Sequence, residues 1–278
     1  MKVVNIDDAL QVKFNNLVRL LRDMPRVLIS FSGGVDSTFL LKVAHETLGD
    51  RVVAVTADSA VRVRREIEWA KAFTRTFGIQ HHIVCSSELT IPEVARNDSR
   101  RCYYCKKYLF GELISFARER HIPFVADGSN RDDDLYYRPG KQAIEEWRIR
   151  SPLKEASLRK REIRVLSKEY ELPTWKEPSQ SCLLTRFPYQ TSITLEDLNR
   201  VATAEDYLRD LGYEQNRIRV SGNDARIEVA PDKVRDLVTG PHAAMMVQRL
   251  KQMGFQHISI DLQGYRSGSM DEGMMTDG

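Results

Sequence analysis

Long apolar segments and signal-peptide features are absent from this 278-residue sequence. No apolar stretch approaches the roughly 20 residues that cross a bilayer, and residues 1–24 carry acidic side chains without the apolar region of a signal peptide. We therefore expect a cytoplasmic protein without a membrane partner.

The net charge of +3 allows an anionic substrate but argues against nucleic acid as a partner. Four cysteines are too few for a disulfide scaffold.

Segments typical of β-strands alternate with helical patterns over residues 1–175. This alternation predicts an α/β domain whose parallel sheet is covered by helices on both faces. Parallel sheets of this kind bind ligands beyond the carboxyl ends of their strands. A basic helix near residues 157–170 is predicted to present a solvated face. The other predicted helices span residues 1–24, 36–48, 61–77 and 103–121, and the predicted strands begin at Arg26, Arg51, His81 and Pro123.

A Pro- and Ser-rich segment at residues 172–182 marks a boundary between domains. Residues 190–268 beyond it follow the order helix, strand, strand, helix, strand. This order predicts a small α+β domain that binds substrate or mediates oligomerisation. The tail from residue 268 has no pattern, and we expect it to fray.

The first predicted strand leads directly into the string Ser32, Gly33, Gly34, Val35, Asp36 and Ser37, which precedes an apolar helix. Glycines let the backbone approach a polyphosphate, and the N–H groups that open a helix then point towards it. The two serine hydroxyls can donate hydrogen bonds to phosphate oxygens, and the aspartate can hold Mg²⁺ or cap the helix. The alternative is a plain strand–turn–helix connection with a serine cap.

The complete S-G-G-x-D-S string in the first βα turn resembles the PP-loop of N-type ATP pyrophosphatases. This resemblance implies that ATP is cleaved between its α and β phosphates to give an adenylate and pyrophosphate. By position as well as resemblance, Ala57 and Asp58 are expected to contact adenosine. Asp127 and Gly128 follow the fourth strand at the same edge of the sheet, and the alternative for both pairs is that they are ordinary turns.

Two of the cysteines, Cys102 and Cys105, form a C-x-x-C at the start of a predicted helix, which places both sulfurs on one face. The helix N-terminus and four nearby basic residues favour their thiolate forms. Cys182 in the boundary segment offers a third thiolate, and three thiolates fit an iron–sulfur cluster with one open iron. Thiol, persulfide or disulfide chemistry is an alternative, as is a zinc site or simple packing. Cys85 is predicted to be a small buried hydrophobe.

Longer motifs narrow the choice of enzyme. Residues 178–189, P-S-Q-S-C-L-L-T-R-F-P-Y, resemble a segment of the LarE family, ATP-dependent sulfur transferases that build a nickel-pincer nucleotide. Further matches lie at residues 137–140, 217–219, 225–228 and 264–268, so the resemblance spans nearly the whole chain.

The LarE resemblance implies a particular reaction. Both carboxylates of a pyridinium biscarboxylic acid mononucleotide would be adenylated and then converted to thiocarboxylates. Some members give up the sulfur of a single cysteine, whereas others carry three cysteines and are thought to use a [4Fe-4S] cluster. Cys102, Cys105 and Cys182 place this chain with the second kind. A sulfide or other sulfur donor and a homo-oligomer are implied as partners.

Three arginines suit an anionic nucleotide substrate. Arg186, Arg217 and Arg219 offer planar forks that match phosphate or carboxylate. Arg217 and Arg219 alternate along a predicted strand and would therefore share one of its faces. Their alternative role is surface solvation.

Acidic residues and two departures from the family pattern complete the set of expectations. By resemblance, Glu205, Glu228 and Asp236 could form an acidic metal or subunit-contact site. Tyr136 stands where the family usually has Asp, and Gln190 stands where it usually has Gly. Both departures concern local loop geometry and not the reaction.

Two other functions fit parts of the sequence. One branch of PP-loop tRNA thiolation enzymes also pairs a C-x-x-C with a cluster, but we find no obvious RNA-binding appendage in the sequence, and its net charge is only +3. A non-catalytic nucleotide sensor with a PP-loop fold is the second alternative. The intact Asp36 and the three cysteines argue against it.

Overall fold

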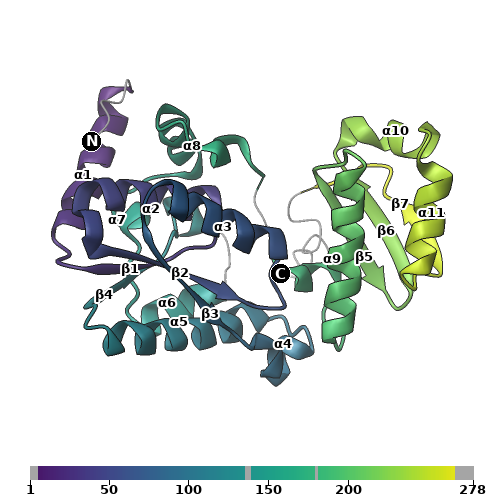
Figure 1. Cartoon of the computed structure of the whole chain (residues 1–278), viewed down its shortest axis with the longest axis horizontal. Helices are drawn as coiled ribbons and strands as arrows, with labels where there is room; N and C mark the ends of the chain where they lie inside the picture. Colours follow the sequence, from purple (N-terminus) through teal and green to yellow (C-terminus); the bar gives the residue numbers. More distant parts are fainter. Residues whose placement is uncertain (1–5, 135–138, 179–180, 267–278) are drawn as a thin grey trace. The chain divides into compact units, whose positions relative to one another are not determined.

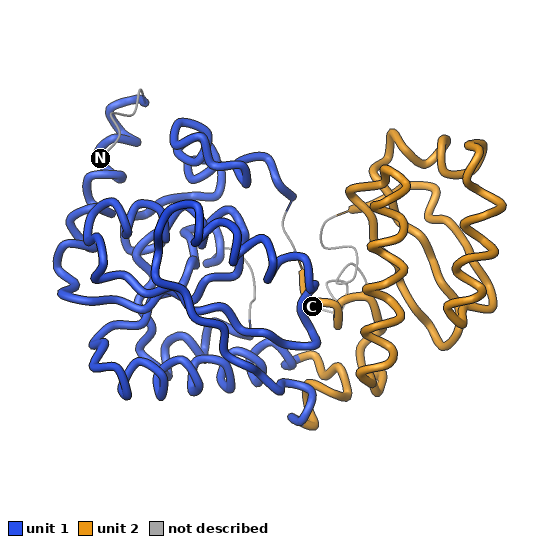
Figure 2. The backbone as a smooth tube through the Cα atoms, viewed as in Figure 1, with its two compact units in different colours: residues 1–91, 100–180 blue, residues 92–99, 181–278 orange. Residues whose placement is uncertain are grey.

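A computed structural model of the chain describes residues 6–134, 139–178 and 181–266, which divide into two compact units (Figures 1 and 2). Unit 1 comprises residues 1–91 and 100–180, and unit 2 comprises residues 92–99 and 181–278. Parts of several sequence motifs lie outside the described residues. These parts are residues 136–138, Ser179, Gln180 and the tail from Ser267.

Unit 1 is built on a parallel four-stranded sheet, as the sequence predicts. In the order β3-β2-β1-β4, its strands are β3 (Gln80–Cys85), β2 (Val52–Asp58), β1 (Val27–Ser30) and β4 (Phe124–Ala126). The central strand β1 pairs with both β2 and β4, with Val27 opposite Val52 on one side and Phe124 on the other. The carboxyl ends of all four strands therefore meet at one edge, where the loops that carry polar residues begin.

Helices cover both faces of this sheet because its strands are apolar on both sides (Figure 1). Val27 and Ile29 of β1 belong to one core cluster, whereas Leu28 between them belongs to the other. The predicted helices are all present. The first begins at Asp8 and not at residue 1, and the others in this unit begin and end within three residues of their expected bounds. The first face packs against α1 (Asp8–Arg22), α2 (Val35–Leu48), α3 (Arg64–Thr76), α7 (Pro152–Glu155) and α8 (Lys160–Glu169), and the second against α5 (Arg101–Glu119) and α6 (Gly140–Glu146).

Unit 2 contains a three-stranded sheet of order β5-β6-β7. Strands β5 (Asn216–Ser221) and β6 (Asp224–Val229) are antiparallel, and β7 (His257–Ile260) joins β6 in parallel. Helix α9 (Leu195–Asp210) begins at a Thr194–Asp197 capping box and packs against β5. The predicted order of elements is present, except that the helical stretch before β7 is two helices, α10 (Val234–Thr239) and α11 (Ala243–Gln252).

Residues 92–99, which include α4 (Pro92–Ala95), group with unit 2 although unit 1 sequence flanks them on both sides (Figure 2). No pattern in the sequence predicts this excursion. The chain consequently passes from one unit to the other three times. None of the helices in the described parts of the chain is long and apolar enough to cross a membrane.

Candidate active site

The phosphate loop, residues 32–37, connects β1 to α2 in unit 1. Gly33 has a φ of 81°, a conformation that favours glycine, and Gly34 is the N-cap residue of α2. The hydroxyls of Ser32 and Ser37 lie 3.0 Å apart, and Ser37 donates to the Gly34 carbonyl at 3.1 Å. Both hydroxyls therefore flank the N-terminus of α2, where the backbone N–H groups and the helix dipole favour an anion.

Asp36, in the first turn of α2, is the acidic centre of this loop. The Lys160 ammonium lies 2.6 Å from its Oδ2, and Asn130 donates to the same oxygen at 3.3 Å. Its Oδ1 is buried and has no hydrogen-bond partner among the described residues. Burial raises the pKa of Asp36, and Lys160 opposes that rise. An ionised carboxylate with one unpaired oxygen beside a phosphate site is suited to bind Mg²⁺.

Lys160 is the residue at this site that the sequence did not single out. It opens α8, the basic helix that we expected to be solvated, and its side chain is only 29% exposed. Its backbone N–H is fixed by the Asp132 carboxylate at 2.9 Å. The expectation of a solvated face is therefore wrong for Lys160. Nothing in the local sequence distinguishes it from the other basic residues of the helix.

The loop after β4 packs directly on the phosphate loop. A Cβ atom added to Gly128 would lie 2.9 Å from the backbone nitrogen of Ser37, so only glycine fits this approach. Asp127 is buried and accepts hydrogen bonds from the hydroxyls of Ser129, at 2.6 Å, and Ser151, at 2.7 Å. These contacts fix the path of the loop that brings Asn130 to Asp36.

The residues expected at the adenosine lie at the carboxyl end of β2. Ala57 is buried, and Asp58 forms an ion pair with Arg64 at 2.8 Å. The Ser59 hydroxyl donates to the buried carboxylate of Glu88. The structure therefore places these residues at the same sheet edge as the phosphate loop.

Cys102 and Cys105 lie in the first two turns of α5, as the sequence predicts, with Cys102 exposed and Cys105 half-buried. Helix α6 begins against this turn. A Cβ atom on Gly140 would lie 3.3 Å from the Cys102 carbonyl oxygen and 2.7 Å from Cδ of Lys106. Gly140, part of the 137–140 motif, therefore permits the close approach of the two helices.

The expectation that Cys85 is buried is wrong. Cys85 is exposed because it is the last residue of β3, the edge strand of the sheet. Cys182 belongs to unit 2, where it precedes a short 3₁₀ helix (Leu183–Arg186), and it is half-buried.

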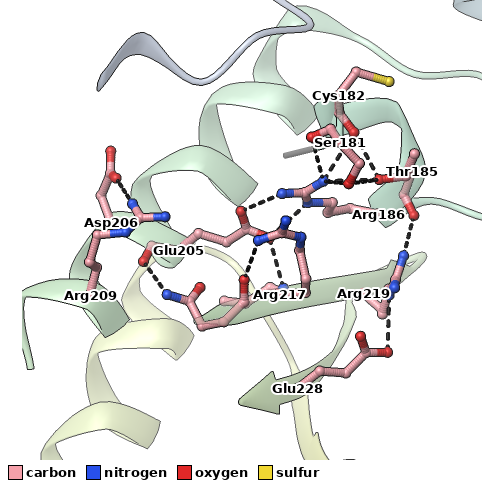
Figure 3. Close-up of polar contacts among 12 residues, drawn as sticks. Ser181, Cys182, Thr185, Arg186, Glu205, Asp206, Arg209, Arg217, Arg219 and Glu228 are labelled. Atoms are coloured by element: carbon pink, nitrogen blue, oxygen red, sulfur yellow. Dashed lines mark hydrogen bonds and ion pairs between the residues drawn. The ribbon is translucent and has the colours of Figure 1, made fainter. Parts of the chain in front are cut away.

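The polar centre of unit 2 is an ion pair between Arg186 and Glu205 (Figure 3). Two parallel hydrogen bonds of 2.8 and 2.9 Å join them, and the Arg186 side chain is 0% exposed. The remaining Nη1 group donates to the carbonyl oxygens of Ser181 and Cys182 and to the hydroxyl of Thr185, at 2.9 to 3.0 Å. Arg186, which the sequence placed among the substrate-binding arginines, thus holds the Cys182 segment in its fold.

Arg217 and Arg219 of β5 lie on the same side of the strand, facing the Cys182 segment (Figure 3). Arg219 pairs with Glu228 at 3.0 Å and donates to the Thr185 carbonyl at 2.6 Å. Arg217 is buried with its guanidinium 5.1 Å from the ring centre of Tyr265. Burial lowers the pKa of Arg217, and the Arg186 charge adds to the effect.

The acidic residues of unit 2 have separate partners. Glu205 pairs with Arg186, Glu228 with Arg219 and Arg226, and Asp236 accepts a hydrogen bond from Tyr213 at 3.2 Å. Over residues 6–134, 139–178 and 181–266, no group of three or more His, Cys, Asp or Glu side chains is arranged to hold a metal ion.

A parallel sheet whose first strand leads through S-G-G-x-D-S into a helix defines the PP-loop class of ATP-using enzymes. The family model of the queuosine biosynthesis protein QueC matches residues 26–95, which hold this loop. An NH₃-dependent NAD⁺ synthetase of Wolinella succinogenes is 31% identical over 42% of this chain and 47% of its own length.

Two relatives match almost from end to end. An uncharacterized protein of Synechocystis sp. is 42% identical over 94% of this chain and 98% of its own length. The pyridinium-3,5-bisthiocarboxylic acid mononucleotide synthase of Lactiplantibacillus plantarum is 34% identical over 95% of each chain. The chain belongs to the family of this synthase, the LarE family, and is an ATP-dependent sulfur transferase.

Proposed function

We propose that this enzyme adenylates the two carboxylates of a pyridinium biscarboxylic acid mononucleotide and converts each to a thiocarboxylate. In each cycle a carboxylate oxygen attacks the α-phosphorus of ATP and pyrophosphate leaves. A sulfide then attacks the acyl carbon, and AMP leaves with the carboxylate oxygen. The substrate class follows from the name of the synthase that is 34% identical to this chain. The observation that best supports adenylation is the ion pair between Asp36 and Lys160 at the phosphate loop.

Within unit 1, the phosphate loop has the groups that this step needs. Ser32, Ser37 and the N–H groups at the start of α2 would bind the β and γ phosphates as pyrophosphate forms. Asp36 would hold Mg²⁺ through its unpaired Oδ1. Lys160, whose ammonium lies 2.6 Å from the other carboxylate oxygen of Asp36, would stabilise the negative charge of the phosphates.

Arg217 and Arg219 would bind the phosphate or a carboxylate of the pyridinium nucleotide. Their shared side of β5 and their positive charge support this role. Arg217→Leu and Arg219→Leu should therefore weaken binding of the nucleotide substrate but leave ATP affinity almost unchanged, since ATP binds in unit 1. If the variants lose affinity for ATP but not for the nucleotide substrate, the proposed role of these arginines in substrate binding is wrong.

Cys102, Cys105 and Cys182 would supply three thiolates to a [4Fe-4S] cluster. Their donor chemistry fits such a cluster, and the first pair shares the exposed N-terminal end of α5. When bound, the cluster offers an iron without a protein ligand, which can carry the sulfide to be transferred. A sulfide donor would restore that sulfur after each cycle, and the protein itself would remain chemically intact.

Adenylation is tested by ATP–pyrophosphate exchange with the carboxylated pyridinium nucleotide, with tRNA, and with neither. We expect exchange only with the nucleotide. Exchange that depends on tRNA would overturn the proposal in favour of a tRNA thiolation enzyme. Asp36→Ala and Ser37→Ala should reduce exchange about 10²- to 10³-fold, because each removes a group that stabilises developing charge.

The sulfur source is tested by iron and sulfide analysis after anaerobic purification, combined with mass spectrometry of the protein after turnover. Cys102→Ala, Cys105→Ala and Cys182→Ala should each abolish the visible absorption of the cluster and sulfur transfer, while adenylation survives. Cys85→Ala, at the exposed end of β3, is the matched control and should be silent. Active, iron-free protein with Cys182 converted to dehydroalanine would instead show that this cysteine gives up its own sulfur.

A further inference from the structure

One face of the sheet in unit 2 collects positive charge. The antiparallel register places Arg217 of β5 opposite Glu228 of β6, and Arg219 opposite Arg226. Residues directly opposite one another in a sheet point to the same face, so three arginines share this face with one glutamate. Glu228 pairs with Arg219 at 3.0 Å and with Arg226 at 3.4 Å. These four side chains therefore give the face, which we call the arginine face, a net positive charge.

Arg217 is buried on the arginine face and contacts an aromatic ring. Its Nη1 donates to the Asn216 carbonyl at 2.7 Å, and its guanidinium lies over the ring of Tyr265, 5.1 Å from the ring centre. The face of an aromatic ring is electron-rich and attracts a guanidinium. A contact through the ring face uses none of the N–H donors, whereas the pairing of Arg186 with Glu205 uses two. The ring can thus hold the Arg217 cation without occupying the groups that bind an anion.

The turn that follows β7 fixes the place of Tyr265. The Asp261 N–H donates to the Ile227 carbonyl at 2.9 Å, and the Tyr265 N–H donates to the Val229 carbonyl at 2.7 Å. Both ends of the turn are therefore attached to β6. Within it, Gly264 has a φ of 70°, and a Cβ atom there would lie 2.6 Å from the Val229 carbonyl oxygen. Backbone contacts and a required glycine thus set Tyr265 beside the arginine face.

The surroundings of Arg217 make this ring contact matter. Burial lowers the pKa of Arg217, and the nearby charge of Arg186 lowers it further, so both disfavour the charged guanidinium. An attractive ring face offsets part of this cost in place. Without the ring, a long cationic side chain would gain by moving its charged end towards water. The location of the guanidinium should therefore depend on Tyr265.

We propose that Tyr265 is a positioning residue whose ring holds the Arg217 guanidinium where it binds the anionic group of the nucleotide substrate. The inference rests on the proposed function for the identity of the substrate, but the placement of Arg217 can be tested without any substrate. Tyr265→Leu removes the ring. Tyr265→Phe is the matched control, because it keeps the ring and removes only the hydroxyl. If Tyr265→Leu does not fold, Tyr265→Met, which fills more of the space without a ring, should show the same losses.

The first measurement is the rate at which phenylglyoxal, a reagent for accessible arginine side chains, modifies Arg217 in ligand-free protein. Mass spectrometry of the peptides quantifies the rate. Tyr265→Leu should raise it several-fold, and Tyr265→Phe should match the parent. Arg200 is the internal reference, because it lies over the ring of Phe255, 4.8 Å from its centre, in the same unit. Its rate should be equal in all three proteins. ATP binding and hydrogen exchange of the β5 amides verify that each variant is folded.

The second measurement is ATP–pyrophosphate exchange with the carboxylated pyridinium nucleotide. Tyr265→Leu should raise the KM for the nucleotide about 10-fold, the usual effect of losing a partly desolvated cation–π contact. The kcat and the KM for ATP should stay near the parent values, and Tyr265→Phe should restore the KM for the nucleotide. In an Arg217→Leu background, Tyr265→Leu should add little. In an Arg219→Leu background it should keep its full effect, because the ring contacts Arg217.

Two results would overturn the inference. One is an equal rate of Arg217 modification in the parent and in folded Tyr265→Leu. The other is a rise in KM that is as large in the Arg217→Leu background as in the parent, since the ring would then act by another route. Faster modification of Arg217 in Tyr265→Leu, with no change of KM in that variant or in Arg217→Leu, would support the placement of Arg217 by Tyr265. It would overturn the proposed role of Arg217 in substrate binding instead.

Discussion

The carbonyl oxygen of Cys182 accepts a hydrogen bond from the Arg186 guanidinium at 3.0 Å. The same guanidinium is paired with Glu205 through two further hydrogen bonds and is withdrawn from solvent. The backbone that carries the third cysteine therefore depends on a buried ion pair. Because both partners are buried, loss of one leaves an uncompensated charge.

Arg186→Met should destabilise unit 2 by about 3–5 kcal/mol, because it leaves the Glu205 carboxylate buried and unpaired. Native-state hydrogen exchange of the β5 amides would measure this loss. Arg209→Met is the matched control, since Arg209 pairs with Asp206 near the surface of α9 and such pairs contribute about 0–1 kcal/mol. Equal effects of the two substitutions would contradict the structural role of Arg186.

Lys160→Met should slow adenylation about 10²-fold and move the acid limb of its pH profile to higher pH. The pKa of Asp36 is raised from its usual 3.8 by burial, and Lys160 is the main group that opposes this rise. Without Lys160 the carboxylate would take up a proton at a higher pH and lose its hold on Mg²⁺. The measurement is the pH dependence of ATP–pyrophosphate exchange. Arg161→Met, which changes an exposed residue of the same helix, should match the parent at every pH.

His81→Gln should reduce the loss of folding stability that unit 1 shows as the pH falls. The His81 ring lies between the hydroxyls of Thr56 and Thr74, each at 2.9 Å, and burial lowers its pKa from 6.5 to about 4. Between those pH values the unfolded chain binds a proton that the folded protein does not, so stability falls as the pH falls. We expect a loss of about 2 kcal/mol in the parent, after allowance for solvent screening, and much less in the variant.

Urea unfolding followed by tryptophan fluorescence measures this change, because all three tryptophans lie in unit 1. His121→Asn is the control, since this exposed histidine lies in the same unit and asparagine tolerates its φ of 53°. The same pH dependence in the parent and in His81→Gln would rule out His81 as its source.

Gln190→Gly should stabilise unit 2 by about 1 kcal/mol. Gln190 has a φ of 59°, in the region that costs other L-residues about 1–2 kcal/mol but glycine almost nothing. Gln248→Gly in the middle of α11 is a control of opposite sign, since glycine costs about 1 kcal/mol there. Hydrogen exchange in unit 2 should show a gain for the first change and a loss for the second. A loss for both would show that the Gln190 side chain matters more than its backbone.

The elements of the fold could be predicted from the sequence because their signals are local. The apolar strand before Ser32 and the helical spacing after Ser37 each depend on neighbouring residues, and they indicated the phosphate loop directly. The family's usual glycine at the position of Gln190 also has a local cause, since the backbone there is left-handed.

The remaining features depend on contacts between residues far apart in the chain. Lys160 meets Asp36 across 124 positions, and in the sequence it is one cation of a basic helix. Arg186 resembled an anion-binding residue because the sequence shows its positive charge. It does not show that the fold pairs this charge with Glu205. The exposure of Cys85 follows from the order of strands, which places β3 at the edge of the sheet.

The excursion of residues 92–99 into unit 2 also determines how the protein can be made. A ribosome delivers this segment well before residues 184–188, so the Asn97 side chain emerges without the carbonyl groups of Leu184, Phe187 and Pro188, to which it donates. Residues 181–278 alone therefore lack part of unit 2, namely residues 92–99. A fragment that starts at Ser181 should need residues 92–99 supplied as a peptide, and in the natural chain this segment lacks these partners until residues 184–193 have been made.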